Sequence, residues 1–248
     1  DESNPLDPPS QFNRLGYGIF NLGPMPLPGG RIAFTSNRNG FQPPKGYTNP
    51  TLQLYVMDED GSNVTAIAPM SIGSTLHPTV LADGRIMFST YESQGLRDQR
   101  LWGVWTIWPD GRHWAPLISA FRRPQSLHFM TQLSGGDVVV VDYYNRNNTG
   151  FGTLYRMPPA LPPGQPAFYD AFATGAPEIG RTTGSGLVYG FTFPFQPVGL
   201  RSITPFTTGE DEAAPVGSGG VRVGKFTHPS AAPNNDLLVV WTPGPAND

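Results

Sequence analysis

Residues 76–117 read LHPTVLADGRIMFSTYESQGLRDQRLWGVWTIWPDGRHWAPL, and this stretch decides the fold. Extended runs alternate with two Asp-Gly turns and one polar loop; the runs span residues 77–81, 85–90, 101–108 and 113–117. Asp-Gly between two alternating runs is a strong hairpin signal, because a type I′ turn needs positive φ at both central residues. The stretch therefore predicts one blade of four antiparallel strands.

The same pattern recurs along the chain. Residues 30–34 (GRIAF) match residues 84–88 (GRIMF), and residues 55–61 (YVMDEDG) match residues 105–111 (WTIWPDG). Weaker copies begin with LHFMTQLSGGDVVV at residues 127–140 and THPSAAPNNDLLVV at residues 227–240. A period near 50 residues with four short strands in each unit is typical of a β-propeller, in which each blade buries its faces against its neighbours.

We therefore predict an all-β chain, either a ring of about five blades or part of a larger propeller. Three prolines and no periodicity in residues 1–15 predict an N-terminal arm. The predicted blades span residues 16–69, 70–120, 121–175, 176–225 and, incompletely, 226–248. A strand is expected at residues 186–193, inside the most degenerate copy. The incomplete last unit suggests a fragment of a longer chain or a ring completed by the arm.

Composition excludes several classes of function. Net charge is −3 and the 16 Lys and Arg residues are scattered, so no basic stripe suited to nucleic acid is present. The absence of cysteine removes disulfides, thiolate metal sites, thiol nucleophiles and covalent haem attachment within this chain. The longest apolar run, near residues 237–241, is too short to span a bilayer.

The unit x-His-Pro-x-x-Leu-x-Asp-Gly-Arg-Ile-x-Phe-x-Ser at residues 76–89, with the strand and turn at residues 55–61, resembles the propeller repeats of TolB-like proteins. Residues 41–50, 91–98, 101–103 and 108–114 are similar to proteins related to the middle domain of the hydrazine synthase alpha subunit. This second likeness covers roughly residues 15–160. It implies an exported, periplasmic or extracellular bacterial protein, and some such proteins carry c-type haem in a separate region. Because Cys-x-x-Cys-His is absent here, any haem must be supplied by another domain.

Three histidines form the candidate metal site. His77 and His228 occupy equivalent repeat positions, and His128 lies within two residues of that position in its own blade. Equivalent positions point the same way around a propeller axis, so these imidazoles could converge on copper or zinc. The alternative is a His-Pro motif that starts each blade, with the ring hydrogen-bonded to a neighbouring backbone group.

A polar rim at one mouth of the propeller is the second candidate, since long loops there commonly bind ligands. Its predicted members are Arg31, Arg85, Lys45, Tyr47 and Asp98. For the two repeat-equivalent arginines the alternative is an ion pair with a turn carboxylate such as Asp83.

Two other patterns have simpler explanations. Residues 58–63 begin like a calcium loop but position 12 is Pro69, so a hairpin turn accounts for them. The tryptophans at 102, 105, 108 and 114 could form a sugar-stacking platform, but packing between sheets is the favoured explanation.

Three functions remain open. The first is a non-catalytic scaffold or interaction module that holds another domain or subunit. The second is the propeller portion of a multidomain redox enzyme. The third is a carbohydrate-active propeller using Glu92, Asp98 and Asp142, which would need two carboxylates at one mouth.

Overall fold

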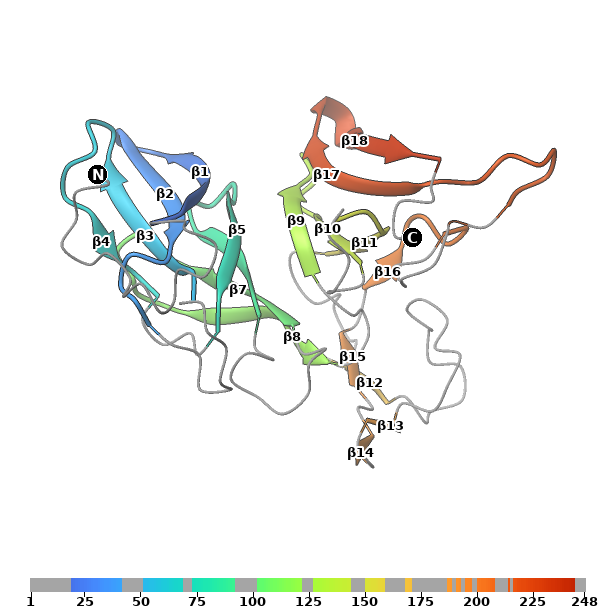
Figure 1. The fold of residues 1–248 in the computed structure, drawn as a ribbon, viewed down its shortest axis with the longest axis horizontal. Helices are drawn as coiled ribbons and strands as arrows, with labels where there is room; N and C mark the ends of the chain where they lie inside the picture. Colours follow the sequence, from blue (N-terminus) through green and yellow to red (C-terminus); the bar gives the residue numbers. More distant parts are fainter. Residues whose placement is uncertain are drawn as a thin grey trace. The chain divides into compact units, whose positions relative to one another are not determined.

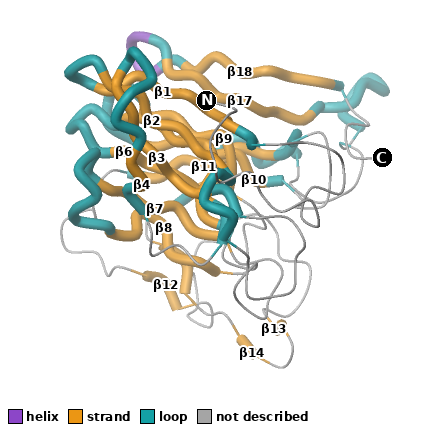
Figure 2. Tube along the Cα trace, turned by 60° about the vertical axis from the view of Figure 1, so that its left-hand side comes forward, coloured by secondary structure: helices purple, strands orange, loops and turns teal. Residues whose placement is uncertain are grey.

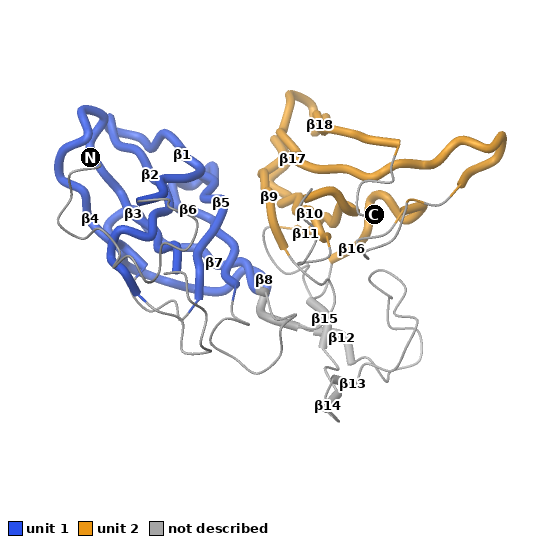
Figure 3. Tube along the Cα trace, in the orientation of Figure 1, with its two compact units in different colours: residues 1–120 blue, residues 121–248 orange. Residues whose placement is uncertain are grey.

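A computed structural model gives the fold, and its strands form two compact units, Asp1–Ala120 and Phe121–Asp248 (Figures 1 and 3). The described residues are 19–41, 51–68, 73–91, 102–121, 127–143, 150–158, 168–170, 187–188, 191–192, 195–197, 200–207, 214 and 216–243. They are almost entirely strands, turns and loops, and the helical turn at Pro233–Asn235 is three residues long (Figure 2). The predicted all-β class is confirmed.

The first unit contains two four-stranded antiparallel blades. The first blade has the order β1-β2-β3-β4, with β1 Asn21–Leu27, β2 Arg31–Ser36, β3 Gln53–Asp58 and β4 Thr65–Ala66. The second has the order β5-β6-β7-β8, with β5 Thr75–Val80, β6 Ile86–Thr90, β7 Trp102–Ile107 and β8 Ala115–Phe121. Strand order follows chain order in both, as expected for blades built from consecutive hairpins.

The core of this unit lies between the two blades. Strand β5 contacts β1, β2 and β3. Ala33 and Val56 of the first blade cluster with Ile86, Phe88 and Ile107 of the second, all nearly inaccessible to solvent. Burial of a side chain of this size contributes roughly 1.5–3 kcal/mol, so neighbouring blades stabilise each other mainly through this interface.

The hairpin turns differ from the predicted type I′. At residues 81–84 the Gly84 N–H donates to the Leu81 carbonyl at 2.9 Å, and Gly84 has a φ of 92° while Asp83 does not have a positive φ. A type I turn followed by one left-handed residue has this pattern. The Asp83 carboxylate also accepts from the backbone N–H of Arg85 at 3.0 Å. The aspartate thus stabilises the turn through its side chain and leaves the positive φ to glycine.

A β-bulge interrupts the first strand of each blade. Gly23, His77, Phe129 and His228 all have φ between 44° and 60°, and each coincides with a register shift against the second strand. The segment around His77 was predicted to be simply extended. Its left-handed residue and bulge were not predicted, because the letters His-Pro also fit a regular strand.

The second unit contains a four-stranded sheet of order β16-β11-β10-β9 and a two-stranded sheet, β17-β18. The strands are β9 Leu127–Gln132, β10 Val138–Asp142, β11 Thr153–Met157, β16 Arg201–Ser202, β17 Lys225–Ala231 and β18 Leu237–Thr242. Strand β17 contacts β9, β10 and β11, in the same way that β5 contacts three strands of the first blade. Val139 and Val141 of β10 cluster there with Leu237 and Val239 of β18.

The expected separate blade at residues 176–225 differs from what the structure shows of this segment. Its β16 is the outer strand of the third blade, held where the Ile203 N–H donates to the Leu154 carbonyl at 2.9 Å. The expected strand at residues 186–193 is a short hairpin, β13 Leu187–Val188 with β14 Phe191–Thr192. A further pair joins β12 Phe168–Asp170 to β15 Phe195–Pro197.

Candidate functional site

The two repeat-equivalent arginines, Arg31 and Arg85, lie beside the tight turns that join the first and second strands of their blades. The predicted rim also included Lys45, Tyr47 and Asp98, which lie outside the described residues. The loop that contains Lys45 and Tyr47 follows β2, whose end at Ser36 is opposite its beginning at Arg31. A ligand-binding rim formed by the loop residues therefore stays a prediction. Arg31 and Arg85 lie at the ends of their strands that are next to the tight turns.

Arg85 is held by the turn that precedes it. Its guanidinium forms an ion pair with Asp83 at 2.7 Å and donates to the Thr106 hydroxyl at 3.1 Å. Burial by itself raises the pKa of the Asp83 carboxyl, but hydrogen bonds from the Arg85 side chain and backbone outweigh this effect and lower the pKa. The structural alternative for Arg85, pairing with a turn carboxylate, is confirmed.

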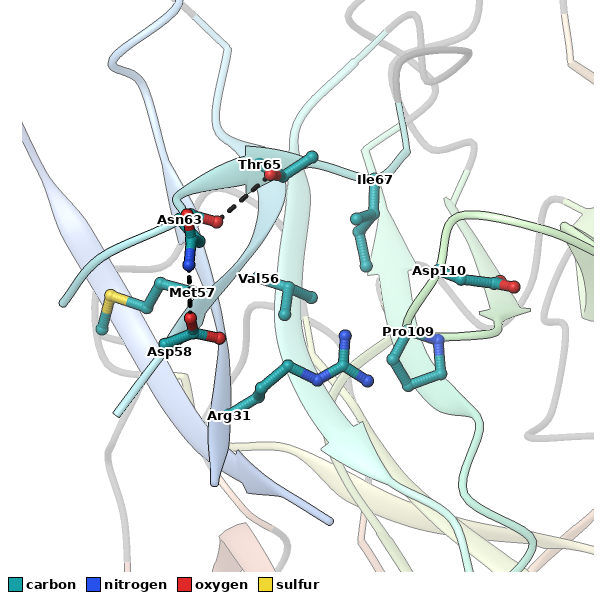
Figure 4. Close-up of a pocket in the computed structure, with 9 residues that line it drawn as sticks. All are labelled: Arg31, Val56, Met57, Asp58, Asn63, Thr65, Ile67, Pro109 and Asp110. Carbon is teal, nitrogen blue, oxygen red and sulfur yellow. Dashed lines mark hydrogen bonds between the residues drawn. The ribbon is translucent and has the colours of Figure 1, made fainter. Parts of the chain in front are cut away.

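Arg31 instead projects into a pocket between the first and second blades (Figure 4). The pocket has a volume of about 290 Å³. It is lined by Arg31, Val56, Met57, Asp58, Asn63, Thr65, Ile67, Pro109 and Asp110. The guanidinium points away from Asp58 toward Val56 and Pro109. Among the described residues it makes no hydrogen bond or ion pair.

The carboxylates of this pocket are engaged by their own turns. Asp58 accepts a hydrogen bond from the Asn63 amide at 2.6 Å, and Asp110 accepts one from the Arg112 backbone N–H at 3.0 Å. Residues 58–63 therefore form a hairpin turn, which agrees with the simpler interpretation of this calcium-loop-like sequence. The lining thus combines the Arg31 guanidinium, the two carboxylates held by their turns and an apolar wall from Val56 and Ile67.

Why the pocket forms here is clear from the neighbouring turn. A side chain at Gly111 would come within 3.2 Å of the Ile67 carbonyl oxygen. Glycine therefore lets the third-to-fourth-strand turn of the second blade approach the first blade, and this approach closes one side of the pocket. Sequence reasoning identified Arg31 by its repeat position but missed the pocket, because its walls come from two different blades.

The three histidines of the metal hypothesis have different surroundings. His77 is half-buried in the first unit, and its left-handed position corresponds to Phe129 and His228 in the second unit. His128, one residue before the equivalent position, is buried. The ring centroids of His228 and Phe129 are 3.9 Å apart, and those of His128 and Tyr143 are 4.6 Å apart.

These contacts make an aromatic cluster in the second unit, composed of His128, Phe129, Tyr143 and His228. Burial raises the pKa of the Tyr143 hydroxyl above its usual value. The His228 Nδ1 lies 3.0 Å from the Thr227 hydroxyl. Within the described residues, no three His, Asp or Glu side chains are grouped closely enough to hold a metal ion. Metal binding by the histidines stays a prediction.

The other aromatic and acidic candidates are largely accounted for by packing. Trp105 and Trp114 stack with centroids 4.5 Å apart and pack against the core of the first unit. Asp142 is 5% exposed at the end of β10, which does not suit a carboxylate at an open mouth. Glu92 lies outside the described residues.

Sequence reasoning missed an exposed apolar face on β18. Leu238 and Val240, which we call the β18 face, are 65% and 50% exposed and lie two residues apart, so they project from the same side of the strand. The register aligns Leu238 with Ala33, Met87 and Val139, each 0% exposed. The position of Leu238 is thus fully buried in the first three blades and exposed in the fourth, which is the β17-β18 pair.

Comparison with known proteins gives the fold. The sequence matches no protein-family model and no curated protein. Among solved structures, hydrazine synthase from Kuenenia stuttgartiensis is 14% identical with a TM-score of 0.52, over 86% of this chain and 25% of that chain. A putative TolB from Agrobacterium tumefaciens is 19% identical with a TM-score of 0.39, over 52% and 42%. A catalytically inactive virginiamycin B lyase from Staphylococcus aureus, with quinupristin, is 12% identical with a TM-score of 0.41, over 92% and 61%.

This chain is a β-propeller in fold. The hydrazine synthase superposition, together with the antiparallel four-stranded blades, carries that statement. At such low identity the likeness extends to fold and not to activity. The chain spans about a quarter of the length of the hydrazine synthase chain and less than two thirds of the other two.

Proposed function

We propose that the chain is a scaffold and interaction module of an exported bacterial protein, non-catalytic by itself, and that the β18 face holds another domain or subunit. The observation that carries this proposal is the exposure of Leu238 and Val240 at positions that are buried in the other blades. An apolar sheet face of this kind is costly to leave in water and is typical of a site that binds protein.

The rest of β18 supports the same interpretation. Its sequence, LLVVWT, is apolar on both sides of the strand, whereas a strand with one side in water alternates apolar and polar residues. Leu237 and Val239 are accounted for, because they pack against the third blade. Leu238 and Val240 are aliphatic on the opposite side, where nothing among the described residues buries them to the same degree.

The proposed compartment is the periplasm or the exterior of the cell. It rests on the TolB-like repeat pattern and on the resemblance to hydrazine synthase alpha-related proteins. The part of the chain that the structure describes contains no helix with the length and hydropathy of a membrane span. We also propose that the chain is part of a longer polypeptide, whose remaining domains are the first partners to test.

Cysteine labelling tests the interaction proposal directly, because the chain has no natural cysteine. Val240→Cys is introduced into the isolated chain and into the protein made from the complete reading frame, and maleimide labelling rates are followed by peptide mass spectrometry. We expect labelling at position 240 to be slowed by about tenfold or more in the complete protein, because a docked side chain reacts after local opening.

Val221→Cys is the matched control, since Val221 is 65% exposed in the same unit and lies away from β18 in sequence. Its labelling rate should be the same in both proteins. Equal rates at position 240 in the isolated chain and the complete protein would refute the proposed function.

A second candidate function is favoured by the fold of the hydrazine synthase match. In it, the module forms the propeller portion of a multidomain redox enzyme, and haem or metal is held by another domain. Haem staining and the absorption spectrum of the complete protein test this candidate; a colourless protein without Cys-x-x-Cys-His elsewhere in the reading frame would eliminate the haem version.

A further inference from the structure

The β18 face corresponds to the side that other blades present to the blade that follows them. In the first blade, Ala33 clusters with Ile86 and Phe88 of the second blade. In the third blade, Val139 and Val141 cluster with Leu237 and Val239 of the β17-β18 pair. Leu238 and Val240 align with Val139 and Val141 in the strand register. The β18 face is therefore equivalent to two faces that are each covered by another sheet.

Both covered faces are covered in the same manner. Strand β5, the first of its blade, contacts β1, β2 and β3, and strand β17 contacts β9, β10 and β11. In each case the second strand of the covering blade supplies two large apolar residues spaced i and i+2: Ile86 and Phe88, or Leu237 and Val239. This spacing puts both side chains on one side of a strand.

The surroundings of the β18 face also favour another β-sheet as its binding partner. The residue paired with Leu238 on β17 is Ser230, which is exposed and uncharged. Neither Leu238 nor Val240 pairs with a charged residue, since Val240 pairs with Thr227. In the two-stranded β17-β18 sheet, β18 has β17 on one side and no third strand among the described residues on the other. Its equivalents β2, β6 and β10 each have a third strand, namely β3, β7 and β11.

We propose that the β18 face binds a further propeller blade, supplied by polypeptide outside residues 1–248, whose second strand places two apolar side chains spaced i and i+2 against Leu238 and Val240. This inference rests on the proposed function and names its partner. The partner's first strand crosses β17 and β18, as β5 crosses the first blade and β17 crosses the third.

Photo-crosslinking from two adjacent positions tests the identity of the partner. Leu238→Cys and Val240→Cys, in the protein made from the complete reading frame, are each labelled during refolding from urea with a benzophenone maleimide and irradiated. We expect both positions to crosslink outside residues 1–248, to one segment with the blade pattern of two alternating runs joined by an Asp-Gly turn. The crosslinked partner residues should be an even number of positions apart on one strand.

Val221→Cys with the same probe is the control and should give no crosslink to that segment. Circular dichroism of each labelled variant shows whether it has refolded, and a variant that has not refolded is replaced by Ser230→Cys, on the neighbouring strand. Crosslinks to a second copy of this chain, to residues within the chain, or to a helix or irregular loop would overturn the proposal. Slower labelling at position 240 without crosslinks to a strand would refute the further blade as the partner, but the proposed interaction module would remain supported.

Discussion

Truncating Leu238 to alanine should destabilise the isolated chain only slightly and the assembled protein much more, whereas truncating its structural equivalent Val139 should be strongly destabilising already in the isolated chain. Both residues belong to the second unit and occupy the same register position on a second strand. Val139 has 0% of its surface exposed, whereas Leu238 has 65%. The free energy of unfolding of the second unit therefore reports on what covers each residue.

The magnitudes follow from the carbon atoms removed. Val139→Ala removes two fully buried carbons, which at ~0.8 kcal/mol each, with an added cavity term, gives a loss of about 2–3 kcal/mol. Leu238→Ala removes three carbons that are about one third buried, so the loss is roughly 0.8 kcal/mol in the isolated chain. When the β18 face is docked, the loss at position 238 should rise to about 2–5 kcal/mol, the range for buried leucine.

Urea denaturation followed by fluorine NMR of 5-fluorotryptophan measures these losses for the second unit. Trp241 is the one tryptophan of residues 121–248, so its resonance separates this unit from the four tryptophans of the first. The comparison requires equal denaturant slopes in the variants. A loss at Leu238→Ala equal to that at Val139→Ala in the isolated chain would refute the reasoning, because Leu238 would then already be covered.

Four further measurements follow from the structure. Gly152→Ala should prevent the second unit from folding, since its Cβ would collide with the Asp142 carbonyl oxygen, and circular dichroism would show the loss of sheet. The Asp83–Arg85 ion pair should add stability at pH values above the ordinary carboxylate pKa, and this stability should be lost as pH falls through the lowered pKa that Asp83 has in the folded chain. Because the Arg85 and Asp83 side chains are 32% and 46% exposed, the ion pair should contribute at most about 1 kcal/mol. Burial raises the pKa of Tyr143, so the contribution of its neutral hydroxyl to folding stability should be complete below the ordinary tyrosine pKa and be lost as pH rises toward the raised pKa of the folded chain. The loss should be visible as tyrosinate absorbance that appears together with unfolding. Metal analysis of the purified chain should find at least one equivalent of copper or zinc if the three-histidine hypothesis holds.

Each of these has a control. Gly219 has a φ of 91°, and no atom lies within 4 Å of the position that a Cβ would take there, so Gly219→Ala should show the cost of backbone strain alone, roughly 1–2 kcal/mol. Asp83→Asn should remove the acid-dependent change, and Tyr143→Phe the alkaline one. Persistence of either pH dependence in its variant would assign it to another group. Metal below one equivalent would eliminate the histidine site.

The blades could be predicted from sequence because their signal is local. Alternating runs and Asp-Gly turns recur at a fixed period, and a hairpin is determined by residues next to one another in the chain. The turn type was wrong for the same local reason. Type I′ turns and type I turns followed by a left-handed glycine both favour Asp-Gly, and Gly84 alone has the positive φ. The distinction lies in the backbone and not in the letters.

The candidate sites were harder to predict because they depend on which blades are neighbours. The partner of Arg85, Asp83, is two residues away and was foreseen. The walls of the Arg31 pocket come from Ile67 and Pro109 of different blades, and no local pattern joins these residues. The β18 face did carry a local signal, since LLVVW is apolar on both sides and resembles the doubly buried VVVV of β10.

The repeated histidines show how a periodic letter can reflect backbone geometry instead of chemistry. Gly23, His77, Phe129 and His228 share a left-handed conformation at the bulge of a first strand, and proline follows all of them except Phe129. Glycine has no side chain and phenylalanine no metal-binding atom, so the shared requirement must be the bulge itself. For non-glycine residues this conformation costs on the order of 1–2 kcal/mol, which the surrounding contacts must offset. In the second unit the tilted ring contact of His228 with Phe129, with centroids 3.9 Å apart, is one such contact. A metal role for His228 would have to compete with this ring contact.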